Sequence, residues 1–138
     1  WGNLKEDEGT ITGNIGRDPN DRMRFKVFPE GDHGKHAVTH YRVLERFGYV
    51  TVVECRLETG RTHQIRVHMA HIGCPILGDP IYGSRNQLFP QATLMLHSSL
   101  LSLRLPGSQD FTEFKSPTPC RFRQILRELH GKYAKCRL

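Results

Sequence analysis

Two neighbouring stretches of the chain alternate between apolar and polar side chains with a period of two, as half-buried strands do. The first covers residues 36 to 45 and the second residues 49 to 57, with Phe47-Gly48 as the turn between them. This pattern predicts an antiparallel hairpin. Its apolar side chains should lie in the core, and we expect this in particular of Val50, Val52, Val53 and Leu57.

A short helix is predicted directly after this hairpin. Gly60 ends the second strand, Thr62 is placed to cap a helix, and Gly73 with Pro75 stops it. The helix should have about three turns. One side of it carries apolar residues at helical spacing, namely Ile65, Met69 and Ile72.

The rest of the chain predicts short strands and one further helix. Residues 1 to 35 are rich in Gly, Pro, Asp and Asn, which favours loops and short strands. Residues 94 to 97, 100 to 105 and 111 to 115 have strand character, and Pro106-Gly107-Ser108 turns the last two into a second hairpin. After Pro119, a helical stripe is formed by Phe122, Ile125, Leu126, Leu129 and Tyr133. We therefore expect one compact α+β unit, with a mixed, mainly antiparallel sheet and flanking helices.

Composition narrows the class of partner. The 20 Lys and Arg residues outnumber the 14 Asp and Glu residues and give a net charge of +6, which favours polyanions. The sequence contains neither an apolar run long enough to span a bilayer nor a secretory leader pattern, so we expect a cytoplasmic protein without a membrane partner. The four widely spaced cysteines are expected to be reduced thiols.

Polar residues suited to chemistry gather where the second strand of the first hairpin gives way to the short helix. Arg61, His63, Gln64 and Arg66 lie within six residues of one another at this junction. A helix N-terminus offers unpaired backbone N–H groups and a positive dipole end, so a phosphate could lie beside Arg61 and His63. The junction therefore suits binding of an RNA backbone.

The same junction carries a family resemblance. Residues 60 to 68 resemble the signature of the RluA-type RNA pseudouridine synthases, and residues 73 to 83 resemble the next motif of that family. The similarity covers nearly the whole chain, through the segments Ile15 to Arg22, Ala37 to Tyr41, Leu96-His97-Ser98 and Phe114-Lys115-Ser116-Pro117. The two signature motifs read Gly-Arg-Thr-His-Gln-Ile-Arg-Val-His and Gly-Cys-Pro-Ile-Leu-Gly-Asp-Pro-Ile-Tyr-Gly.

The resemblance implies a function and a site. It implies isomerisation of uridine to pseudouridine in ribosomal or transfer RNA, without a cofactor, on the second half of the synthase fold. It assigns Arg66 to the catalytic machinery as the partner of a catalytic aspartate. A guanidinium can hold a carboxylate by two hydrogen bonds, and Lys would replace it poorly. Arg61, His63 and Gln64 are the candidates for forming the RNA-binding site.

The catalytic aspartate itself is missing from these residues. In the family it lies in an Arg-Leu-Asp element, which occurs nowhere in the sequence. We therefore expect residues 1–138 to be a partial catalytic domain that begins after the segment with the aspartate, so that this N-terminal segment is its partner and the chain alone is inactive. Asp79 is expected to bind backbone groups or to pair with a nearby basic side chain.

Two other functions are open at this stage. His68, His71 and Cys74 recur at intervals of three, and His33, His36 and His40 form a second group, so a metal-binding module is conceivable. Helical geometry rarely provides a tetrahedral site from one segment, and we expect no metal. The missing aspartate would equally suit a noncatalytic RNA-binding protein on a degenerate synthase scaffold.

Overall fold

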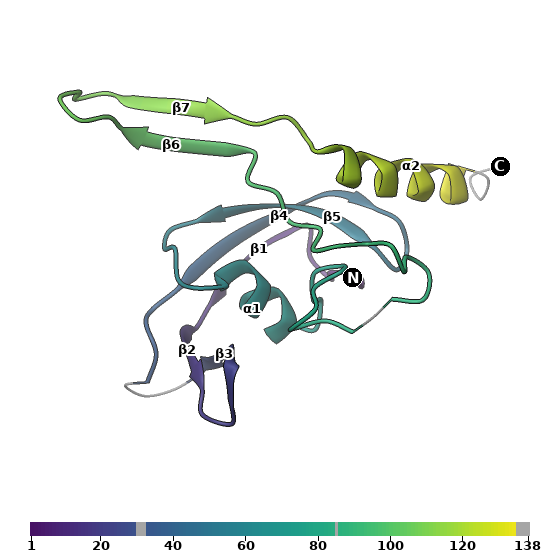
Figure 1. Ribbon diagram of the computed structural model, residues 1–138, viewed down its shortest axis with the longest axis horizontal. Helices are drawn as coiled ribbons and strands as arrows, with labels where there is room; N and C mark the ends of the chain where they lie inside the picture. The colour runs from purple at the N-terminus through teal and green to yellow at the C-terminus, as the bar shows by residue number, and fades with distance from the viewer. Residues whose placement is uncertain (30–32, 85, 135–138) are drawn as a thin grey trace. The chain divides into compact units, whose positions relative to one another are not determined.

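The computed structural model describes residues 1–29, 33–84 and 86–134 of the chain. They fold into two compact units, Trp1–Leu94 and Met95–Leu138, each with its own elements (Figure 1). Every strand pairing among the described residues is antiparallel, and two helices accompany the strands. The predicted α+β class is confirmed, whereas the expected single compact unit was wrong, because the chain divides into two.

The first unit is built on a three-stranded antiparallel sheet in the order β1-β4-β5, formed by β1 (Glu8–Thr12), β4 (Val38–Arg46) and β5 (Thr51–Leu57). The hairpin predicted from the alternation is β4 and β5, with Gly48 at φ 81° in its turn. Val50 is buried as expected, whereas Leu57 is 47% exposed. The prediction for Leu57 was wrong because this residue ends β5, which pairs only with β4.

A second hairpin in this unit consists of β2 (Asn14–Asp18) and β3 (Asp21–Phe28). Its tight turn is made by carboxylates that accept backbone N–H groups two residues ahead, from Asp18 to Asn20 and from Asp21 to Met23, both at 2.9 Å. Short strands in the first 35 residues were predicted, and the structure confirms them.

Helix α1 (Gln64–His71) follows β5 but does not begin as predicted. Its N-cap is His63 in the left-handed conformation, with no side-chain cap, so the predicted Thr62 cap was wrong. The helix has eight residues, just over two turns rather than three. Its end is as expected: Gly73 has φ 83°, and the N–H groups of Gly73 and Cys74 bind the carbonyls of Ala70 and Met69, which is a Schellman motif.

Helix α1 lies between the sheet and the β2–β3 hairpin (Figure 1), contacts both β3 and β4, and contributes to two apolar clusters. Val67 packs with Ile15, Ala37 and Tyr82, against which Phe25 and Val27 of β3 are placed. Met69 packs with Leu4 and Ile11. The helix therefore packs between the sheet and the β2–β3 hairpin, and this packing positions the polar residues that precede it.

The second unit contains the hairpin of β6 (Leu100–Arg104) and β7 (Phe111–Lys115) and the helix α2 (Cys120–Ala134). Both were predicted, and Ile125 and Leu129 of α2 are buried. The Tyr133 side chain lies outside the described residues. Residues 94 to 97 were expected to form a strand but are irregular, because they join none of the described sheets. Within the described residues, no helix combines the length and apolar character that crossing a bilayer needs.

Candidate functional site

The junction between β5 and α1 is organised by Gln64, whose side chain is buried at 3% exposure. Its carbonyl oxygen accepts the Thr59 hydroxyl at 2.7 Å and the Arg61 backbone N–H at 3.0 Å. Its amide donates to the carbonyl oxygen of Val38 and to the Thr39 hydroxyl, both at 3.0 Å. Every polar position of this carboxamide is thus occupied within the chain, and Gln64 fixes the junction to β4.

The network continues from Thr39 to His68, which is fully buried in α1. Nδ1 of His68 lies 2.8 Å from the Thr39 hydroxyl, and Nε2 lies 3.2 Å from the Gly13 carbonyl oxygen. Since a carbonyl only accepts, Nε2 carries the proton and Nδ1 accepts from Thr39. Burial, more than the nearby His71, lowers the pKa of His68, although the bond to Gly13 opposes this. Both ring nitrogens are therefore used by the protein, which removes His68 from the metal-binding alternative.

Arg66, in the first turn of α1, forms a bidentate and largely buried ion pair. Its Nε and Nη2 atoms donate to the two carboxylate oxygens of Asp79, each at 2.9 Å. The Asp79 side chain is fully buried and that of Arg66 is 13% exposed. Asp79 also accepts the backbone N–H groups of Ile81 and Tyr82 at 2.9 and 3.1 Å. The expectation that Asp79 binds backbone groups and a basic side chain is confirmed.

This pair has a defined charge state. Burial by itself would raise the pKa of Asp79, but the hydrogen bonds from Arg66, Ile81 and Tyr82 and the charge of Arg66 together lower it. The same hydrogen bond raises the pKa of Arg66. Asp79 is therefore ionised at neutral pH, and it holds the guanidinium in one orientation.

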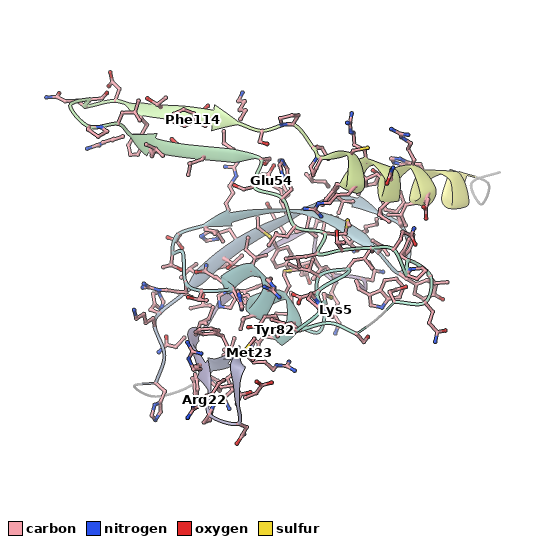
Figure 2. All side chains as sticks on the ribbon, viewed as in Figure 1. Lys5, Arg22, Met23, Glu54, Tyr82 and Phe114 are labelled. Atoms are coloured by element: carbon pink, nitrogen blue, oxygen red, sulfur yellow. The ribbon has the colours of Figure 1, made fainter. Side chains whose placement is uncertain are left out.

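Tyr82 connects this pair to His63 and to strand β3. The Arg66 guanidinium lies 5.2 Å from the centre of the Tyr82 ring. The Tyr82 hydroxyl lies 2.8 Å from Nδ1 of His63 and accepts the Phe25 backbone N–H at 2.9 Å. The His63 ring meets the rings of Phe25 and Tyr82 edge-on, with centroids 5.7 and 5.6 Å apart. In Figure 2 the labelled Tyr82 lies beside the hairpin that carries Met23 and Arg22.

His63 holds an unfavourable backbone conformation to take part in this cluster. Its φ of 54° is the only positive value among the non-glycine residues that the structure describes. Burial, followed by the charge of Arg66, lowers the pKa of His63, and Asp79 offsets part of this effect. A neutral ring whose Nδ1 accepts a hydrogen bond from the Tyr82 hydroxyl fits both the lowered pKa and the 2.8 Å distance between these atoms. Residues held in this region of φ tend to lie at functional sites, where the surroundings fix them.

The structure brings together some of the residues predicted for the site. His63 and Arg66 meet at Tyr82, while Arg61 is half-buried and donates from Nε to the His36 carbonyl oxygen at 2.9 Å. Gln64 lies beneath them in the interior, and its carboxamide is not presented to solvent. The sequence reasoning missed Tyr82 as a member of the site, although its place three residues after Asp79 in the second motif could have indicated it.

Comparisons with known proteins agree on one family. A family model described as RNA pseudouridylate synthase matches residues 3–71. An uncharacterized RNA pseudouridine synthase of Chloroflexus aurantiacus is 47% identical over 124 residues, which cover 90% of this chain and 38% of that protein. The ribosomal large subunit pseudouridine synthase D of Pseudomonas aeruginosa is 45% identical, over 86% of this chain and 40% of that protein.

Solved structures lead to the same fold. The human RNA pseudouridylate synthase domain containing 1 superposes with a TM-score of 0.67 at 27% identity, over 94% of this chain and 62% of that chain. The second-half synthase fold expected from the resemblance is thus consistent with the observed architecture. The chain spans about two fifths of the length of the curated relatives it matches.

Proposed function

Because this chain belongs to the RNA pseudouridylate synthase family, we propose that it forms part of an enzyme that isomerises uridine to pseudouridine in RNA. In this reaction the bond from N1 of uracil to C1′ of ribose breaks and a bond from C5 to C1′ forms. The proton leaves C5 and N1 gains one, so the formula is unchanged and no cofactor is consumed. The match over residues 3–71, which contains Arg66 and the junction around it, carries the proposal.

Ribosomal RNA is the substrate class that the relatives favour over transfer RNA. The relatives from Pseudomonas aeruginosa and Xanthomonas campestris are both named ribosomal large subunit pseudouridine synthase D. The net charge of +6 suits a polyanionic substrate. We propose large-subunit ribosomal RNA as the substrate, and hence the cytoplasm as the place of action.

The geometry of Arg66 supports its proposed role as partner of a catalytic aspartate. A guanidinium has five N–H donors. Asp79 engages one on Nε and one on Nη2, and the described residues provide no further hydrogen-bond acceptor for the remaining three. A second carboxylate could therefore bind Arg66 through Nη1 while Asp79 keeps the guanidinium in place. The charge of Arg66 would stabilise the ionised form of that second carboxylate.

We propose that this second carboxylate comes from a part of the natural protein outside these 138 residues. No Arg-Leu-Asp element occurs within them, and the relatives are more than twice as long. Under this proposal residues 1–138 are a partial catalytic domain. Arg61 and His63 would line the approach of the RNA, and Gln64 would hold the junction that positions them.

The test is isomerisation by the full-length natural protein with transcribed large-subunit ribosomal RNA, read out by nucleoside mass spectrometry. Pseudouridine should accumulate with the wild type. Arg66→Ala should abolish turnover and leave RNA affinity largely unchanged, since the lost contact is to a carboxylate. Arg56→Ala is the matched control, because Arg56 is 80% exposed and forms a surface ion pair with Glu54 at 3.3 Å; its turnover should equal that of the wild type.

Two outcomes would overturn the proposal. RNA binding by the wild type without any pseudouridine would favour the noncatalytic scaffold in place of an enzyme. Turnover by Arg66→Ala equal to that of an active wild type would show that Arg66 takes no part in the reaction.

A further inference from the structure

Strand β3 carries a row of cations along one face. Arg22, Arg24 and Lys26 occupy alternate positions, and successive side chains on one face of a strand are about 6.6 to 6.8 Å apart. On the other face of β3, Phe25 and Val27 pack against the apolar cluster around Tyr82. The hairpin is thus anchored by its apolar face and presents a line of positive charge, with Arg22 and Lys26 exposed.

These charges are not neutralised within the described part of the chain. None of Arg22, Arg24 and Lys26 forms an ion pair with a described residue. Among the described carboxylates, the nearest in sequence, Asp18 and Asp21, are engaged by backbone N–H groups of the turn. By contrast, the exposed Arg42 and Arg56 of the large sheet both lie beside Glu54. Within the described residues, the three cations of β3 therefore have no ion-pairing partner.

Aromatic rings lie beside two of the three cations, Arg24 and Lys26. The Lys26 ammonium lies 5.0 Å from the centre of the Phe28 ring, and the Arg24 guanidinium lies 5.4 Å from that of Tyr82. A cation that already rests on a ring loses less side-chain entropy when it binds an anion. The row is pre-organised for a ligand with regularly spaced negative charges.

The middle cation of the row, Arg24, lies at the site described above. Arg24 and Arg66 both lie over the Tyr82 ring, at 5.4 and 5.2 Å from its centre, and the Phe25 N–H binds the Tyr82 hydroxyl. A strand of nucleic acid whose phosphates follow β3 would therefore pass directly beside Tyr82, His63 and Arg66.

We propose that the Arg22, Arg24 and Lys26 row of β3 binds the phosphate backbone of the RNA next to the target uridine. This proposal rests on the proposed function for the identity of the polyanion. A linear array of cations backed by aromatic rings suits a single RNA strand, which carries one charge per nucleotide. Such contacts fix the register of the RNA without reading its sequence.

The experiment compares two double variants of the full-length natural protein that change charge equally. Arg22→Gln with Lys26→Gln, and Arg42→Gln with Arg56→Gln, each lower the net charge of this chain from +6 to +4. Affinity for large-subunit ribosomal RNA is measured from 0.1 to 1 M salt. Each phosphate contact contributes a slope of about 0.7 to 0.9 in log affinity against log salt. The β3 variant should lose about 1.4 to 1.8 of the wild-type slope.

This loss of slope means that the β3 variant should bind the RNA about 25- to 60-fold more weakly than the wild type at 0.1 M salt. The two affinities should converge near 1 M salt. The control on the large sheet should keep the wild-type slope within about 0.4. Arg22→Lys with Lys26→Arg, which keeps both charges, should restore binding. All four side chains are exposed, and thermal unfolding of each variant verifies that the fold is intact.

An unchanged slope in the β3 variant, or an equal loss in the control, would overturn the phosphate contact. Either result, with pseudouridine still formed by the wild type, leaves the proposed function standing. If the slope falls as expected but the wild type forms no pseudouridine, the phosphate contact stands and the proposed isomerisation fails.

Discussion

The buried carboxylate of Asp79 offers the sharpest test of how this site is held. Asp79→Asn keeps the size of the side chain and one acceptor oxygen, but it removes the charge. It also places an NH₂ group where an oxygen now accepts. Oδ1 of Asp79 accepts Nη2 of Arg66 and the N–H groups of Ile81 and Tyr82, and Oδ2 accepts Nε of Arg66, so the NH₂ group must face a donor in either orientation.

The magnitude follows from burial. A hydrogen bond to a charged group contributes about 1.5 to 3 kcal/mol, and removal of one partner from a buried pair costs about 3 to 5 kcal/mol. The Arg66 side chain is 13% exposed and can recover some hydration, which places the expected loss near the lower end, about 3 kcal/mol. Asp7→Asn is the control: Asp7 is 91% exposed and also pairs with an arginine, Arg46, and its loss should cost less than about 1 kcal/mol.

The assay is urea unfolding of the chain and both variants at several pH values. The pKa of Asp79 is lowered in the folded state, so the stabilisation by its charge is complete above its usual value of 3.8 and is lost as pH falls through the folded pKa. The gap between wild type and Asp79→Asn should therefore be constant above about pH 5 and narrow below about pH 4. Equal losses in both variants at neutral pH, or a gap that persists in acid, would refute this account of the pair.

Three further predictions concern the same unit and use the same measurement. Gln64→Glu should cost about 2 to 5 kcal/mol, because it puts a charge against a backbone carbonyl, whereas the exposed Gln124→Glu should stay within about 0.5 kcal/mol. Gly73→Ala should lower the free energy of unfolding by about 1 to 2 kcal/mol because of the positive φ, since its added Cβ meets nothing within 4 Å. Gly78→Ala should lower it by about 1 to 3 kcal/mol more, because its Cβ would lie 2.1 Å from a backbone oxygen. Equal losses in the two variants would contradict this geometry. The pKa of His68 is lowered in the folded chain, so the unfolded chain binds the proton at higher pH and stability should fall as pH drops below about 6.5. His68→Gln should flatten this dependence of stability on pH. An unaltered dependence would exclude His68 as its source.

The elements that could be predicted are those whose pattern is local. A period of two on each side of Gly48 was enough for the β4–β5 hairpin, and helical spacing after Pro119 was enough for α2. Residues 94 to 97 also have apolar strand character, yet they form no strand, because a strand also needs a pairing strand, which local sequence does not reveal. The predicted start of α1 was wrong for a related reason. His63 takes a left-handed conformation in which its ring contacts Tyr82 and Phe25, and these contacts are not visible in the local sequence.

For the site, the motif of residues 60 to 68 was sufficient to single out Arg66, because its resemblance to a family signature is visible without a fold. It indicated the family as well, which the comparisons then established. The partners of these residues were decided only by tertiary structure. Asp79 lies 13 residues from Arg66, and Phe25 lies 57 residues from Tyr82, yet each pair is in hydrogen-bond contact. Burial also decided that Gln64 serves the junction from inside, because exposure depends on what packs above a residue and not on its neighbours in sequence.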